Sequence, residues 1–140
     1  MPIVFSNEWA VAWGAALNAS PAYQTAAATW EGTIAAAVVP SVGAAPTAAT
    51  FLDVWHGECR TARAATPADL AGADFVIEGA PDAWRELLSG RLAPLMALLS
   101  GRIQLTRGEL ARLLPYAGAA RELVGLAASI NAEFPPDWGS

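Results

Sequence analysis

Two short helices and a strand are predicted for residues 80–107 from the spacing of their apolar positions. The six residues 87–92 (LLSGRL) recur in nearly the same form at residues 98–103 (LLSGRI). In each copy, leucines precede a glycine, the residue that most readily ends a helix in a left-handed conformation. A proline stands near the start of each expected helix, at Pro81 and Pro94, where a missing N–H has no cost. After the second glycine, apolar residues alternate with polar ones, which predicts a half-buried strand.

Both of these helices carry their apolar residues on one face, as expected for helices that cover a core. The apolar face of the first contains Trp84, Leu87 and Leu88. The apolar face of the second contains Leu92, Leu95, Met96 and Leu99.

The same signals divide the rest of the chain into helices and strands. Helices are expected at residues 7–18, 21–28, 109–114 and 116–131, with a loop at 41–50. Further strands are expected at residues 30–39, 50–55, 59–65 and 74–78. Two helices have clear apolar stripes, namely Trp9, Trp13 and Leu17 in one and Tyr116, Ala120, Leu123, Ala127 and Ile130 in the other.

The order of these elements predicts an α+β domain. A tight turn at His56-Gly57 makes a hairpin in which Leu52 and Val54 share one face. We expect a five-stranded, mainly antiparallel sheet with helices covering one face, because that arrangement buries the apolar side of both layers. Residues 1–132 form one domain in this interpretation, and residues 133–140, which contain two prolines, form a flexible tail.

Composition limits the environment of the protein. The chain has 140 residues, of which 54% are hydrophobic, yet no apolar run approaches the roughly 20 residues of a membrane span. The N-terminus lacks the basic start and apolar core of a signal peptide. The one cysteine excludes an internal disulfide and fits a reducing compartment, so a cytoplasmic location is expected.

Charge argues against two classes of partner. The formal net charge is −5, and all eight basic residues are arginines. An acidic domain without a basic run is a poor candidate for binding nucleic acid or an anionic membrane. We therefore expect no nucleic-acid partner and no stable insertion into a membrane.

A possible reactive group is confined to the hairpin turn, where His56, Glu58 and Cys59 lie close together in the sequence. An imidazole beside a thiol could make a nucleophile or bind a metal. A closed zinc site needs about four ligands, however, and this chain has one histidine and one cysteine. We favour a role for His56 and Glu58 in the turn and for Cys59 in the sheet. No catalytic residue, metal site or cofactor is predicted.

The repeated segment also resembles a known family. Gly90-Arg91-Leu92-Ala93-Pro94, followed by Gly101-Arg102-Ile103-Gln104-Leu105, resembles the signature of the type-two sterol carrier protein family. The resemblance implies a sterol-carrier-like fold that encloses an apolar tunnel between helices and sheet. Members of that family hold fatty acids, acyl-CoA or sterols in this tunnel.

The resemblance converts an ordinary apolar core into a predicted lipid cavity. The expected function is that of a non-enzymatic carrier of a fatty acid, acyl-CoA or sterol-like ligand. Arg91 or Arg102 could meet an acidic head group, although we favour simple solvation at the surface for both. The alternative is a module for homodimerisation or accessory interaction, without a physiological lipid. The residues expected to line the cavity are Trp84, Leu88, Leu92, Leu95, Met96, Leu99, Ile103, Leu105, Leu110, Leu113, Leu114 and Leu123.

Overall fold

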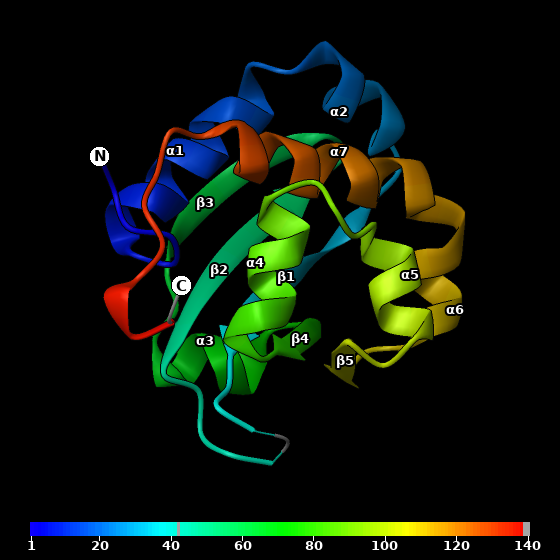
Figure 1. The fold of residues 1–140 in the computed structure, drawn as a ribbon. Coiled ribbons are helices and arrows are strands. Elements are labelled where there is room, and N and C mark those ends of the chain that lie inside the picture. The colour runs from blue at the N-terminus through cyan, green and yellow to red at the C-terminus, as the bar shows by residue number, and fades with distance from the viewer. Residues whose placement is uncertain (42, 139–140) are drawn as a thin grey trace.

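The computed structural model describes residues 1–41 and 43–138 and contains a five-stranded sheet with the order β3-β2-β1-β4-β5 (Figure 1). All five predicted strands are present within a few residues of their expected bounds. Val42, in the predicted 41–50 loop, lies outside the described residues. The strands are β1 (Glu31–Val38), β2 (Ala48–Trp55), β3 (Glu58–Ala64), β4 (Phe75–Gly79) and β5 (Ile103–Arg107).

The sheet is mixed. The β1–β2, β2–β3 and β4–β5 pairs are antiparallel, as expected, whereas β1 and β4 run parallel with Ile34 opposite Phe75. The parallel pair arises because the chain leaves β3, passes through α3 (Pro67–Gly72) and returns beside β1 in the central part of the sheet. This crossover places the parallel pair at the middle of the sheet, where both strands can be covered by helices.

Most helices lie on one side of the sheet, as predicted (Figure 1). These are α1 (Asn7–Asn18), α2 (Pro21–Ala26), α4 (Pro81–Leu88), α5 (Pro94–Leu99), α6 (Leu110–Leu113) and α7 (Ala117–Ser129). The structure differs from the prediction in that α3 covers part of the opposite face. There, Leu70 of α3 packs against a small cluster that contains Ala35 and Val76.

The helix starts follow the caps that the sequence contains. Ser6 accepts a hydrogen bond from Trp9 N at 3.2 Å, and Ser20 accepts one from Tyr23 N at 3.2 Å. Such caps satisfy amide groups that have no partner inside the helix. Gly90 and Gly101 follow α4 and α5 with φ angles of 75° and 78°, as the two repeated glycines predicted.

The C-terminal segment packs against the domain instead of hanging free. Val4 N donates to Glu133 O at 2.9 Å, and Glu133 N donates to Pro2 O at 2.9 Å. The ring of Trp138, in the 3-10 helix Pro136–Trp138, lies 6.0 Å from that of Phe5. Up to residue 138, the structure therefore differs from the expected loose tail, because aromatic side chains anchor the segment. Residues 139 and 140 of that predicted tail lie outside the described residues.

Two glycines with left-handed backbones give a matched test of this packing. A Cβ atom on Gly108 (φ 95°) would overlap the buried ring of Phe75, whereas a Cβ atom on Gly90 would meet open space. In both Gly→Ala variants the free energy of unfolding should fall by about 1–2 kcal/mol, because alanine is strained in a left-handed backbone conformation. In Gly108→Ala it should fall by about 1–3 kcal/mol more, because the added methyl group overpacks the core. Urea unfolding of the two variants measures the difference, and equal losses would contradict the predicted close packing around Phe75.

Candidate functional site

A pocket of about 100 Å³ lies between the sheet and the helices that cover it. Its floor comes from the sheet, through Ile34 and Ala36 of β1, Ile77 of β4 and Ile103 of β5. The helices and their connections supply the other walls. These wall residues are Trp13, Tyr23, Ala27, Trp30, Trp84, Leu87, Pro94, Leu95, Leu98, Leu113, Tyr116, Ala117, Ala119, Ala120, Leu123 and Val124.

Small residues on facing elements leave the space unfilled. Successive side chains of a strand point to opposite faces, so Ile34 and Ala36 reach the pocket while Ala35 belongs to the cluster beneath α3. Across the pocket, α7 presents Ala119 and Ala120 between larger side chains. An alanine on each side leaves room that two leucines would occupy.

Two tryptophans tie separate elements together at the walls of the pocket. Trp13 Nε1 of α1 donates a hydrogen bond to Leu123 O of α7 at 2.9 Å. Trp84 Nε1 of α4 donates to Ala37 O of β1 at 2.9 Å. Because a buried indole N–H needs a partner, each bond fixes the position of a large ring and holds a helix in place.

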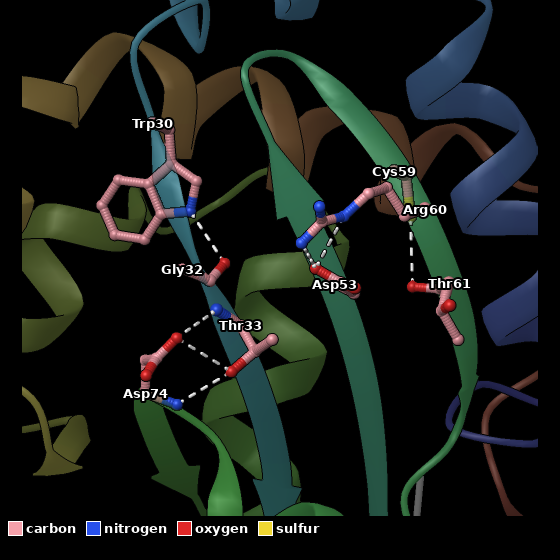
Figure 2. Close-up of polar contacts among 8 residues, drawn as sticks. All are labelled: Trp30, Gly32, Thr33, Asp53, Cys59, Arg60, Thr61 and Asp74. Carbon is pink, nitrogen blue, oxygen red and sulfur yellow. Dashed lines mark hydrogen bonds and ion pairs between the residues drawn. The ribbon is translucent and has the colours of Figure 1, made fainter.

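The polar atoms of two further wall residues also have partners in the protein. Trp30 Nε1 donates to Gly32 O at 3.1 Å, as Figure 2 shows. The hydroxyl of Tyr116 hydrogen-bonds with Thr29 Oγ1 at 2.9 Å and donates to Thr29 O at 3.1 Å. These contacts use polar groups that would otherwise face an apolar space.

The glycine at position 79 leaves space for the ring of Trp84. A Cβ atom at this position would lie 3.0 Å from Trp84 Nε1 and 2.8 Å from Ile103 Cγ2. The absence of a side chain at the end of β4 therefore allows the indole to reach the carbonyl of Ala37.

No charged side chain lines the pocket in the part of the chain that the structure describes. Arg112 lies behind the wall residue Trp30, with its guanidinium 6.0 Å from the ring centre of Trp30, and donates to Glu31 O at 3.0 Å. Arg102, one of the two arginines considered for an acidic head group, pairs with Glu86 at 3.0 Å and with Asp82 at 3.5 Å. Arg102 is therefore paired with two carboxylates next to the start of β5, and it does not line the pocket.

Besides the Trp30 contact, Figure 2 shows polar contacts of residues that do not line the pocket. Asp74, directly before β4, accepts hydrogen bonds from Thr33 N at 2.9 Å and from Thr33 Oγ1 at 3.2 Å. Arg60 pairs with Asp53 at 2.9 Å across the hairpin of β2 and β3. These contacts join neighbouring strands at the surface of the sheet, and we assign them a structural role.

The hairpin residues are arranged as parts of the turn and the sheet. His56 Nε2 lies 2.6 Å from Glu31 Oε2, and both side chains are about half exposed. The thiol of Cys59 is buried and donates to Thr61 O at 3.4 Å. Burial raises the pKa of Cys59 from about 9 to about 11, which keeps the sulfur protonated at neutral pH. Among the described residues, no group of three or more histidine, cysteine, aspartate or glutamate side chains could hold a metal ion.

The structure brings five of the twelve predicted cavity residues to the pocket. They are Trp84, Leu95, Ile103, Leu113 and Leu123. Four others are half-buried without reaching it, namely Leu88, Leu92, Leu105 and Leu110. The last three are exposed: Met96 by 58%, Leu99 by 60% and Leu114 by 46%.

The orientation of α5 differs from the prediction. Leu95 and Leu98 line the pocket and Ala97 is fully buried, whereas Met96 and Leu99 face solvent. The six residues of this helix, PLMALL, are all apolar. Their pattern therefore carries no information about which face is inward, and the packing of the whole domain decides it.

Sequence reasoning missed most of the wall on the side of α1 and α2, including Tyr23, Trp30 and Ile34. Trp13 was expected only as part of a core-facing stripe. The stripe Tyr116, Ala120 and Leu123 was recognised, and all three residues line the pocket. The apolar stripes of the helices expected at residues 7–18 and 116–131 were a usable signal. Each stripe needs an apolar surface to pack against, and the two helices could have been expected to face one another.

Comparison of the sequence with models of protein families shows the family of this chain. The sequence model of the SCP-2 sterol transfer family matches residues 14–113. The chain belongs to the SCP-2 sterol transfer family. No match was found among curated proteins.

Solved structures agree with membership of the SCP-2 family. A crystal structure of sterol carrier protein 2 shares 47% sequence identity and a TM-score of 0.82, covering 91% of this chain and 98% of the other. A solution structure of a Thermus thermophilus protein, described as possibly a sterol carrier protein, shares 47% identity and a TM-score of 0.80. That match covers 97% of this chain and 94% of the other.

A more distant relative shows that the SCP-2 fold itself is shared. The sterol carrier protein domain 2 of Helicoverpa armigera has 15% identity and a TM-score of 0.56, covering 84% of this chain and 86% of the other. None of the helices in residues 1–41 and 43–138 is long and apolar enough to cross a membrane.

The state of Cys59 can be tested by alkylation. The raised pKa lowers the thiolate fraction at pH 8 by roughly 100-fold relative to a pKa near 9. Iodoacetamide should therefore label the native protein at least 100-fold more slowly than the urea-unfolded chain. The native rate should continue to rise with pH until about pH 11, where the thiol ionises. Rapid labelling at pH 8 would contradict this prediction and favour a thiol enzyme.

Proposed function

We propose that this protein is a non-enzymatic carrier that binds an apolar lipid in the pocket between sheet and helices. The observation that carries the proposal is the character of the walls, which are apolar and free of charge. Each methylene group moved from water into such a space contributes about 0.8 kcal/mol. A fatty acyl chain, an acyl-CoA or a sterol-like ring system could therefore bind with few polar contacts. Membership of a sterol transfer family supports the same conclusion.

The pocket must widen to accept a ligand of this size. Its volume of about 100 Å³ is smaller than the engineered cavity of about 150 Å³ that binds benzene. The element best suited to move is α5, which has six residues and no side-chain cap at its N-terminus. It lies between Gly90 and Gly101, and a Cβ atom on either glycine would meet nothing within 4 Å. An outward shift of α5 would enlarge the space next to Leu95 and Leu98.

The charge of the ligand follows from the same walls. A carboxylate or phosphate has no cation to meet inside the pocket, so an ionised head group would remain at the surface.

The single buried thiol is consistent with a reducing compartment such as the cytoplasm. The net charge of −5 disfavours nucleic acid as a partner.

A second candidate function is supported by the outer face of α5. Met96 and Leu99 are exposed there although both are large and apolar. Exposed apolar patches often mark interaction sites, and a second copy of the chain would be the simplest partner. Light scattering distinguishes the two candidates. A monomer that takes up lipid supports the carrier, and an obligate dimer that takes up none supports the interaction module.

Two neighbouring residues on α5 give a matched test of the carrier function. Leu95→Trp places a larger side chain inside the pocket, and Met96→Trp places the same side chain in solvent. Leu95→Trp should reduce the uptake of a fluorescent long-chain fatty acid by at least tenfold. Met96→Trp should bind it as the unchanged protein does. In a solid core, Leu95→Trp would instead cost about 1–3 kcal/mol through overpacking.

The measurements are fatty-acid titrations and thermal unfolding of both variants after delipidation. Native mass spectrometry of the protein before delipidation would identify any lipid taken from the host. Loss of stability in Leu95→Trp, together with no uptake by the unchanged protein, would reject the proposed function.

A further inference from the structure

The wall segment of residues 110–116 is tied to the start of β1 by two side chains. Arg112 of α6 donates a hydrogen bond to Glu31 O at 3.0 Å. The hydroxyl of Tyr116 donates to Thr29 O at 3.1 Å and hydrogen-bonds with Thr29 Oγ1 at 2.9 Å. We call these contacts of Arg112 and Tyr116 the latch.

The latch attaches to a fixed point, because its two residues bind the neighbours of Trp30 in the sequence. Trp30 N donates to Ala27 O at 2.9 Å, and Trp30 O accepts from His56 N at 2.7 Å. Its indole N–H donates to Gly32 O (Figure 2). The rings of Trp30 and Tyr116 lie 4.9 Å apart. The latch therefore joins its segment to a wall residue that several other elements hold in place.

The part of the wall formed by α5 has no comparable tie. Among the residues that the structure describes, the hydrogen bonds of α5 stay within residues 93–101, such as Ala97 N to Ala93 O and Ser100 N to Met96 O, both at 2.9 Å. The six side chains of α5 are all apolar. Apolar contacts are not directional, so α5 can shift along its neighbours without breaking a specific bond.

This difference between two parts of the wall determines where the pocket opens. We infer that Arg112 and Tyr116 are positioning residues that hold residues 110–116 against the sheet, so that a ligand enters and leaves on the side of α5. The inference rests on the proposed function and adds the route that the ligand takes.

A latch of this kind controls the rates of binding and leaves the affinity unchanged. Without the latch, residues 110–116 can also move away from the sheet, and the pocket gains a second route. A second route speeds entry and exit by the same factor, because the empty and filled states that it connects are the same. The loss of one hydrogen bond that holds the segment closed corresponds to about a two- to tenfold change in rate.

Stopped-flow binding of cis-parinaric acid, a fluorescent long-chain fatty acid, measures both rates on the delipidated protein. Arg112→Met keeps the apolar stem of the side chain and removes the donor, and Tyr116→Phe removes the hydroxyl alone. Each variant should raise the association and dissociation rate constants together, by about two- to tenfold. The Kd should stay within about twofold of the value for the unchanged protein, because both rates change by the same factor.

Arg60→Met is the matched control. Arg60 also lies over a tryptophan ring and pairs with a carboxylate, but on the hairpin of β2 and β3, and it does not line the pocket. This variant should leave both rate constants unchanged. Unchanged rates in both latch variants, a weaker Kd with an unchanged association rate, or an equal rise in Arg60→Met would overturn the inference.

Amide hydrogen exchange tests the latch without a ligand. Ala97 N and Ser100 N are bonded within α5 and at its end, whereas Leu114 N and Ala117 N are bonded in the latched segment and at its end. In the unchanged protein, protection factors should be at least about tenfold higher for the second pair than for the first. Arg112→Met should lower the protection of the second pair and leave that of the first pair unchanged.

Equal protection of both pairs in the unchanged protein, or an equal loss for both pairs in the variant, would overturn the latch. The proposed function fails separately if the unchanged protein binds no cis-parinaric acid although its protection factors agree with the latch. The route inferred for the ligand then fails with it.

Discussion

The hydrogen bonds made by buried indole groups are the interactions on which the pocket depends. Trp84 joins α4 to the central strand β1, and Trp13 joins α1 to α7. Each ring is large enough to hold two layers apart, and its N–H group fixes it in one orientation. Without these bonds the helices could settle onto the alanines of β1 and α7 and close the space. The directional contacts of these two indoles thus help to hold the elements around the pocket in place.

This arrangement explains several sequence features that do not concern the ligand. Gly79 has no side chain because the Trp84 indole occupies the space. The alanine-rich pattern of β1 and α7 gives a high hydrophobic content without filling the interior with large side chains. The indole N–H groups of Trp13, Trp30 and Trp84 are satisfied by backbone carbonyls, so the walls present mainly apolar surface.

The sequence predicted local structure well wherever proline, glycine or a capping residue marks the end of an element. The two prolines and two glycines of the repeated segment placed α4, α5 and β5. Features that depend on distant parts of the chain were less accessible. The parallel pairing of β1 with β4 follows from the crossover through α3, and the packing of the C-terminal segment depends on Phe5, far away in the sequence.

The same limit applies to the candidate site. A helix with the sequence PLMALL has no polar side, so its inward face is set by what surrounds it. Met96 and Leu99 were therefore expected inside and lie outside. In contrast, Trp84, Leu113 and Leu123 lie in the wall of the pocket, and polar neighbours mark the outer side of their helices. Tyr23 and Trp30 could not have been assigned, since the segments that bring them to the pocket show no stripe.

The six tryptophans of the chain provide the most direct test of the account. Their indole N–H groups give separate signals in a ¹H–¹⁵N spectrum, which can be recorded during titration of the delipidated protein with a long-chain fatty acid. The account predicts that the signals of Trp13, Trp30 and Trp84 shift, because these rings line the pocket. The signals of Trp9, Trp55 and Trp138 should remain in place. Shifts confined to these last three signals, or no shift at saturating ligand, would contradict binding in the pocket.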